Sequence, residues 1–134
     1  MKPLVSVVVP SFNHARYLSD RLESIFAQTL QDFEVIILDD ASTDGSRDVI
    51  EKYAEHPKVS HVSFNAINSG SPFLQWEKGS GLARGKYIWI AESDDTAADT
   101  FLETLSHELD TSPATVLAYC RSNSIDCSGV VHGY

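Results

Sequence analysis

Residues 87–95 read Tyr-Ile-Trp-Ile-Ala-Glu-Ser-Asp-Asp, a short apolar run that stops abruptly on acidic residues. Gly85 and Lys86 precede it, and a run of this length that is rich in Ile and aromatic residues is typical of a buried strand. Asp94 and Asp95 are therefore expected at the C-terminal end of a strand. In open α/β sheets, this is the edge where ligands bind.

The two adjacent carboxylates repel each other unless a cation lies nearby. A hard divalent ion, Mg²⁺ or Mn²⁺, is the simplest partner, because it takes oxygen ligands and often bridges to substrate phosphates. A purely structural alternative is that Asp94 or Asp95 caps the following helix. The pair alone does not decide between a metal site and a helix cap.

Composition predicts one globular domain and restricts its partners. The chain has 134 residues, of which 43% are hydrophobic and 22% charged, and its formal charge is −9. Nucleic acid or an anionic membrane surface would require clustered Lys and Arg, so we expect neither as a partner. An anionic substrate would need a metal ion, helix N-termini or a few placed cations to offset the field of the protein.

No apolar run approaches the roughly 18 residues of a membrane span, and the N-terminus does not have the pattern of a signal peptide. We therefore expect a cytoplasmic protein. Cys120 and Cys127 have no zinc-type spacing and are expected to be free thiols.

Strands and helices are predicted to alternate along the chain. Apolar runs predict strands at residues 4–9, 33–38, 59–64 (nearer the sheet edge), 87–90 and 115–120, and a turn at 126–129 leads to a further strand at Val130. Helical spacing of apolar residues predicts helices at about 15–28, around 49–54, at about 72–83 and over 101–109. Asn13 is a candidate cap for the first helix, and residues 96–99 resemble a capping box for the last.

This alternation predicts a mostly parallel α/β sheet that is flanked by helices on both faces. With the common strand order 3-2-1-4, the first and fourth strands are neighbours where the winding reverses. Three polar strand ends then converge on one crevice: residues 10–13, the pair Asp39 and Asp40, and the pair Asp94 and Asp95.

Four ordered motifs resemble the nucleotide-sugar-binding part of family 2 glycosyltransferases with the Rossmann-like GT-A fold. They are Val-Ser-Val-Val-Val-Pro-Ser-Phe-Asn at 5–13, Ser-Ile-Phe-Ala-Gln-Thr at 24–29, Asp-Asp-Ala-Ser-Thr-Asp-Gly at 39–45, and the stretch from Gly85 to the second acidic pair. The resemblance covers essentially the whole chain, in the correct order.

The resemblance implies an inverting, metal-dependent transfer of a sugar from a nucleoside diphosphate, commonly UDP, to an acceptor hydroxyl. It implies that Pro10, Ser11, Phe12 and Asn13, together with Asp40, hold the base and ribose. It further implies that Asp94 faces the ribose as part of the metal site, and that Asp95 holds the Mn²⁺ or Mg²⁺ ion on the diphosphate. Such an ion stabilises the charge that grows on the leaving diphosphate.

The chain departs from the family pattern at two points. Many members carry an Arg-Asn pair before the acidic strand, where this chain has Gln75-Trp76-Glu77-Lys78. Lys78 is a candidate substitute that reaches the diphosphate, and an exposed helical lysine is the alternative. The general base of the family lies far downstream, so we expect residues 1–134 to form a single donor-binding domain that is truncated before the acceptor-binding half.

Three further residues near the predicted site have a simple structural explanation. His14 is expected on the surface in the first helical turn, and Trp76 in the core under a loop. Glu92 is a candidate neighbour of the metal site, or a partner of Lys86 or Arg84.

Two other classes of function stay open. A receiver-type signalling domain also has a strand that ends in Asp-Asp, but its pattern requires an acidic phosphoacceptor after the third strand and a lysine after the fifth. This chain has Asn65 and Arg121 near those positions. A nucleotide-binding module without catalysis is the second alternative. The donor sugar, the base, the oligomeric state and the acceptor, whether glycan, lipid-linked or protein, are not predicted by the sequence.

Overall fold

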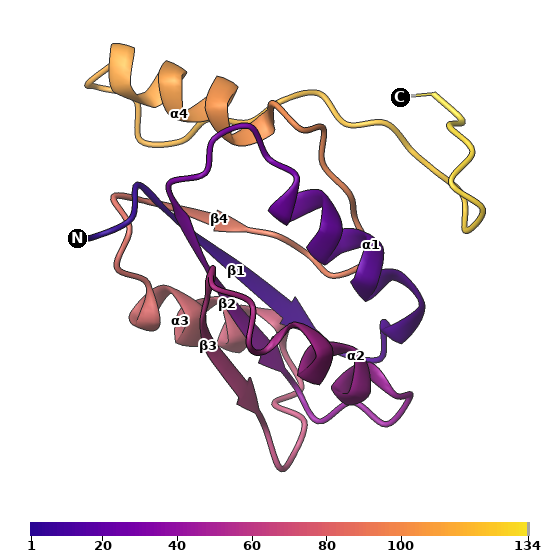
Figure 1. The fold of residues 1–134 in the computed structure, drawn as a ribbon. Helices are drawn as coiled ribbons and strands as arrows, with labels where there is room; N and C mark the ends of the chain where they lie inside the picture. The colour runs from indigo at the N-terminus through magenta and orange to yellow at the C-terminus, as the bar shows by residue number, and fades with distance from the viewer. Residues whose placement is uncertain (134) are drawn as a thin grey trace.

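The computed structural model describes residues 1–133, in which four strands alternate with four helices (Figure 1). The order is β1 (Val5–Ser11), α1 (Ala15–Phe26), β2 (Phe33–Asp39), α2 (Ser46–Tyr53), β3 (Val59–Phe64), α3 (Pro72–Leu82), β4 (Tyr87–Ile90) and α4 (Phe101–Thr111).

The four strands form one parallel sheet in the order β3-β2-β1-β4, which confirms the predicted topology and the edge position of β3. The register places Ser11 opposite Asp39 and Val8 opposite Ile90. Because all strands run the same way, the segments that follow β1, β2 and β4 leave the sheet on the same side, at the C-terminal ends of the strands. We refer to this side below as one edge of the sheet, and to the side of the N-terminal strand ends as the opposite edge.

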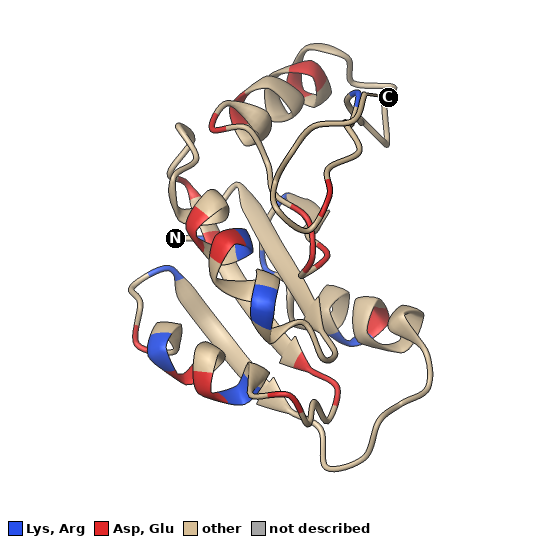
Figure 2. Cartoon of the chain, turned by 90° about the vertical axis from the view of Figure 1, so that its right-hand side faces the viewer, with Lys and Arg blue, Asp and Glu red and all other residues tan. Residues whose placement is uncertain are grey.

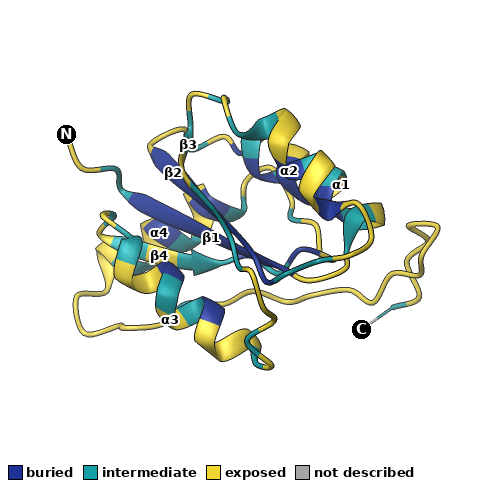
Figure 3. Ribbon diagram, turned by 90° about the horizontal axis from the view of Figure 1, so that it is seen from below, coloured by how far each residue is buried: buried dark blue, intermediate teal, exposed yellow. Residues whose placement is uncertain are grey.

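Helices cover both faces of the sheet, as Figure 3 shows from below. Strand alternation directs Val5, Val7 and Val9 toward α1, α2 and α4, where they form the larger apolar core with Leu22 and its neighbours. Val8 points to the opposite face and packs with Ile36, Leu38 and Leu82 under α3. β1 and β2 are buried along their whole length, as expected for central parallel strands.

The start of α1 differs from the prediction, because Asn13 does not cap it. Asn13 has a φ of 55°, and its Oδ1 instead accepts a hydrogen bond from the Thr43 backbone N–H. The carboxylate of Asp44, in the loop between β2 and α2, accepts the N–H of Ala15 at 2.9 Å. The first free N–H of α1 is therefore satisfied by a residue from the neighbouring strand end.

The capping box predicted at residues 96–99 is also wrong, because α4 begins at Phe101 and Thr100 makes no side-chain cap. The preceding carbonyls bind the connection between α1 and β2 instead. Gln28 Nε2 donates to the Ala98 carbonyl, and the Thr29 N–H donates to the Asp99 carbonyl. These tertiary contacts hold residues 96–99 out of the helix.

The strand predicted at 115–120 does not form. Val116, Leu117 and Tyr119 are exposed, and Figures 1 and 3 show this part of the chain running apart from the sheet. β-propensity alone does not order a strand without a partner. The turn at 126–129 is confirmed, but the strand beyond it is limited to a single bridge between Ile125 and Val131.

Candidate functional site

The segment after β1 lies between the two acidic strand ends, as the register requires. Ser11 pairs with Asp39 on one side, and the Ala91 N–H donates to the Val8 carbonyl on the other. Asn13 ties this segment to the loop after β2, because its own N–H donates to Ser42 Oγ at 2.9 Å. Phe12 is exposed in this segment. The predicted convergence of the three strand ends is therefore confirmed.

The carboxylate of Asp40 is almost fully buried and organises the loop before α3. It accepts hydrogen bonds from both side chain and backbone of Ser69 and from the side chains of Asn65, Asn68 and Gln75, at 2.7–3.2 Å. Burial opposes ionisation, but these hydrogen bonds, with the charge of Lys78, outweigh it and lower the pKa of Asp40 below its usual value. Asp40 is thus an ionised carboxylate, and the hydrogen-bond donors that surround it all belong to this chain.

Asp94 and Asp95 lie exposed in the turn that follows β4, which we call the acid turn (residues 92–95). Ser93 Oγ is 2.7 Å from Nδ1 of His14, while Nε2 of His14 is 4.0 Å from Asp94 Oδ2. His14 therefore contacts the acid turn, which sequence reasoning did not anticipate.

The acid turn is held from both faces of the sheet. From α1, Arg21 Nε donates to the Glu92 carbonyl at 2.6 Å, and its Nη2 lies 3.7 Å from Asp95 Oδ2. From α3, Trp76 Nε1 donates to Glu92 Oε1 at 2.7 Å. Glu92 is thus committed to Trp76, and the predicted pairing with Lys86 or Arg84 is wrong.

Arg21 was missed by sequence reasoning, although it carried a signal. It falls on the apolar stripe of α1 between Leu18 and Ile25, and it is as buried as they are. Desolvation lowers the pKa of its guanidinium, and the carboxylates of Asp95, Asp94 and Glu92 act in the opposite direction. A charged residue on a buried helical stripe is a feature that requires a partner.

Lys78 extends toward the end of β3. Its Nζ donates to Ser63 Oγ at 2.7 Å and to Asn65 Oδ1 at 2.8 Å. Asn65 in turn donates to Asp40, so Lys78 supports the Asp40 cluster through Asn65.

Several buried polar atoms at this edge lack a hydrogen-bond partner within residues 1–133. Four such side-chain atoms occur, and all four lie near the converging strand ends: Ser11 Oγ, Arg21 Nη1, Asp39 Oδ1 and Gln75 Oε1. Buried polar atoms are normally paired, so these four are exceptions among the described residues. Because they are shielded from solvent, they lie beneath the surface of the site and do not form it.

The acid turn provides some, but not all, of the oxygen ligands that a hard divalent ion needs. Asp94 and Asp95 offer exposed carboxylate oxygens, the ligand type that Mg²⁺ and Mn²⁺ prefer. Within residues 1–133, however, no group of three or more His, Cys, Asp or Glu side chains is placed to hold a metal. An ion here would need further oxygens from a ligand or from water.

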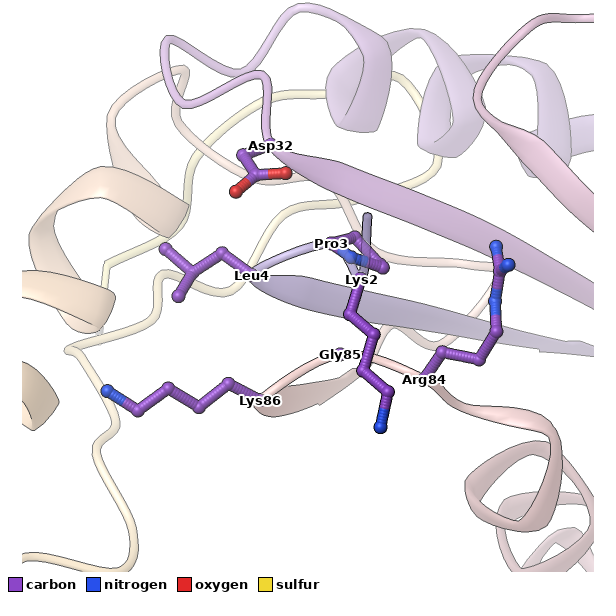
Figure 4. Close-up of a pocket in the computed structure, with 7 residues that line it drawn as sticks. All are labelled: Lys2, Pro3, Leu4, Asp32, Arg84, Gly85 and Lys86. Atoms are coloured by element: carbon purple, nitrogen blue, oxygen red, sulfur yellow. The ribbon is translucent and has the colours of Figure 1, made fainter.

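An open hollow lies elsewhere, at the opposite edge of the sheet. It has a volume of about 350 Å³ and is lined by residues that precede the strands, among them Lys2, Asp32, Arg84 and Lys86 (Figure 4). Arg84 is paired with Glu34, and Lys86 with Asp110. The hollow is therefore separate from the acid turn.

Comparison with known proteins identifies the family of this chain. The model of glycosyl transferase family 2 matches residues 6–132. The chain belongs to this family. Its α/β sheet is that of the GT-A fold, as the four motifs of the sequence predict.

Relatives within glycosyl transferase family 2 are larger than this chain. It is 39% identical over 94 residues to the putative teichuronic acid biosynthesis glycosyltransferase TuaG of Bacillus subtilis, a match that covers 70% of the chain and 37% of TuaG. It is 34% identical over 117 residues to the glycosyltransferase GlyG of Streptococcus pneumoniae, covering 87% and 38%. The matches thus span well under half of each of these relatives.

Some solved structures of similar proteins contain nucleotides. The structure of S. aureus TarS residues 1–349 in complex with UDP matches 83% of this chain and 32% of that one, with 31% identity and a TM-score of 0.73. The mannosyltransferase PcManGT of Pyrobaculum calidifontis, in complex with GDP-Man and Mn²⁺, matches 81% and 33%, with 27% identity and a TM-score of 0.70.

Other predictions about this chain have simpler outcomes. Cys120 and Cys127 are free and exposed, as expected. None of the helices in residues 1–133 is long and apolar enough to cross a membrane. The receiver-type alternative is not supported, because the family match covers almost the whole chain.

Proposed function

We propose that residues 1–134 form the donor-binding part of an inverting, metal-dependent glycosyltransferase, and that the donor is a UDP-sugar. The observation that carries this proposal is the convergence of the ends of β1, β2 and β4 at one edge of the sheet, where the carboxylates of Asp94 and Asp95 are exposed. A nucleoside diphosphate offers many hydrogen-bonding groups, and parallel α/β sheets bind such ligands at this edge. The nucleotide complexes of TarS and PcManGT support the assignment.

We assign the nucleoside to the end of β1 and to Asp40. Pro10, Ser11, Phe12 and Asn13 provide a short wall, in which Phe12 is exposed and Ser11 Oγ has no partner among the described residues. Because the Asp40 carboxylate already accepts hydrogen bonds from the loop, a base N–H would take the place of one of these donors. Asp40 therefore acts on the nucleoside both directly and through the loop it holds.

We assign the diphosphate to the acid turn. Asp95, with Asp94, would hold a Mn²⁺ or Mg²⁺ ion, and the missing ligands would come from the phosphates. The ion supplies Lewis-acid stabilisation of the negative charge on the departing diphosphate. The chain itself contributes orientation, because Arg21 and Trp76 fix the acid turn from both faces of the sheet. Lys78 binds Ser63 and Asn65, so we expect it to act through Asp40 and not on the phosphates.

Binding of UDP, GDP, CDP and dTDP, measured by calorimetry with Mn²⁺ and with EDTA, tests the proposal. We expect UDP to bind most tightly and Mn²⁺ to strengthen its binding, because a protein of charge −9 repels phosphates. Asp95→Ala should remove most of the gain from Mn²⁺. Asp32→Ala, at the opposite edge, is the matched control and should keep it.

Each result has a definite meaning. Equal UDP affinity in Mn²⁺ and in EDTA would contradict the metal assignment. Failure of all four nucleotides to bind would contradict the donor site as a whole. Tighter binding of GDP than UDP would leave the site in place and change the donor.

A further inference from the structure

Arg21 is buried beneath a group of acids that face solvent. Its side chain is 3% exposed, whereas those of Asp94 and Asp95 are 49% and 69% exposed. The guanidinium lies 5.3 Å from the centre of the Trp89 ring, and Nε binds the Glu92 carbonyl. Nη1 has no hydrogen-bond partner in the described part of the chain.

Negative charge is in excess at the acid turn, as it is in the whole chain, whose acidic and basic residues are coloured in Figure 2. Three carboxylates lie within four residues, at Glu92, Asp94 and Asp95. Arg84 and Lys86, the cations nearest in sequence, pair with Glu34 and Asp110 away from this turn. Among residues 1–133, the Arg or Lys side chain that pairs with the acid turn is that of Arg21, with Asp95, while Nε2 of His14 lies 4.0 Å from Asp94.

We propose that Arg21 is a positioning residue that acts as the built-in counter-charge of the acid turn and so makes the divalent ion bind together with the diphosphate. This inference rests on the proposed function. A fixed positive charge near Asp95 repels a free divalent ion, which also finds too few protein ligands there. A diphosphate brings both the missing oxygens and the negative charge that offsets the repulsion.

Two substitutions separate the charge of Arg21 from its hydrogen bond. Arg21→Gln removes the charge but keeps an amide donor at the position of Nε, so the bond to the Glu92 carbonyl is preserved. Arg21→Lys keeps the charge but has no donor at that position. Arg47→Gln is the matched control, because Arg47 pairs with Glu51 on the exposed face of α2.

Calorimetric titration with MnCl₂ alone, without nucleotide and at constant ionic strength, gives the deciding measurement. We expect Arg21→Gln to bind Mn²⁺ about three- to tenfold more tightly than the wild type, because a like charge has been removed. Arg21→Lys and Arg47→Gln should match the wild type. A merely structural role would predict the opposite, since a loosened acid turn binds the ion more weakly.

Unchanged or weaker Mn²⁺ binding by Arg21→Gln would overturn the proposal, as would Arg21→Lys binding as tightly as Arg21→Gln. These titrations contain no nucleotide, so they are distinct from the test of the donor site. A wild-type protein that binds no nucleotide would refute the proposed function and leave the Mn²⁺ comparison interpretable.

If Arg21→Gln does not fold, Asp95→Asn provides a second test by thermal unfolding. Removing an acid from a protein of charge −9 ordinarily relieves repulsion. If Asp95 balances a buried guanidinium, Asp95→Asn instead lowers the unfolding midpoint, by about 3 °C or more. Asp32→Asn is the control. An unchanged or raised midpoint for Asp95→Asn would overturn the proposal.

Discussion

Trp76 Nε1 donates a 2.7 Å hydrogen bond to Oε1 of Glu92, which joins helix α3 to the acid turn. Burial raises the pKa of Glu92, and the charges of Asp94 and Asp95 raise it further, while the bond from Trp76 lowers it. The net shift is upward, so ionised Glu92 destabilises the folded protein. The hydrogen bond to Trp76 offsets part of this cost.

The first prediction concerns Glu92→Gln and pH. A raised folded-state pKa means that stability falls as pH rises from the unfolded value toward the folded one, and stays lower above it. Glu92→Gln removes this destabilisation. The unfolding midpoint of the variant minus that of the wild type should therefore be larger at pH 7 than at pH 4. Thermal unfolding at both pH values tests this. Glu77→Gln on the exposed side of α3 should show no such trend.

A second pH effect of opposite sign comes from Glu34. Burial opposes its ionisation, but hydrogen bonds from Arg84 and Ser6 outweigh this and lower the pKa of Glu34 to about 2. The stabilisation is therefore complete above the unfolded pKa of about 4.5 and is lost as pH falls toward 2.

Glu34→Gln should accordingly cost about 1–3 kcal/mol at pH 7 and progressively less below pH 4.5. Denaturant unfolding across this range provides the measurement. Glu51→Gln, which breaks only an exposed pair with Arg47, should cost well under 1 kcal/mol throughout. A constant cost of Glu34→Gln at every pH would contradict the assignment.

The strands could be predicted because continuous β-branched runs are buried on both faces, and the same signal failed at residues 115–120. That segment has similar β-propensity but no neighbour to complete its hydrogen bonds. Local sequence reports the preference of a segment, whereas strand formation also requires a partner from elsewhere in the chain.

The site was predicted in outline for the same reason. Strand ends and acidic pairs are local features, and their convergence follows from the topology. The ligands of Asp40 come from residues 65–75, and the contact of Arg21 with Glu92 spans 71 positions. Such long-range pairs depend on packing. Neither the full set of hydrogen bonds to the Asp40 carboxylate nor the contact of Arg21 with the acid turn could therefore be predicted.

The third prediction concerns two glycines of α3 that have opposite effects. Both weaken the helix by about 1 kcal/mol relative to Ala. At Gly79, however, an added Cβ would lie 2.2 Å from Val8 Cγ1 in the core, while at Gly81 nothing lies within 4 Å. Gly79→Ala should destabilise the protein by about 1–3 kcal/mol through overpacking. Gly81→Ala should stabilise it by about 0.5–1 kcal/mol.

Chemical denaturation of the two variants tests this directly, since each adds one methyl group to the same helix. A stabilising Gly79→Ala would mean that α3 can move away from β1 at little cost. That result would also weaken the argument that α3 fixes the acid turn through Trp76.

The fourth prediction concerns Asp40. Asp40→Ala removes the carboxylate that accepts from Asn65, Asn68 and Ser69, although Asn68 keeps its bond to the carbonyl of residue 40. We therefore expect a loss of about 1–3 kcal/mol in stability. It should also weaken the binding of uridine and of UDP by the same factor, because β1 lies between the end of β2, where Asp40 is, and the acid turn after β4. Calorimetry with both ligands checks this. Lost UDP affinity with retained uridine affinity would reverse the assigned roles.

The last prediction concerns transfer. Attack by an acceptor hydroxyl needs a base within hydrogen-bond reach, and the acids near the acid turn each have another duty. Asp40 holds the loop, Glu92 is bound by Trp76, and we assign Asp94 and Asp95 to the metal. The 134-residue protein should therefore bind a UDP-sugar but transfer it negligibly. A comparison of product formation with that of a longer chain containing these residues tests this. A comparable rate would place the base within residues 1–134, and Glu92→Gln would then be the first variant to assay.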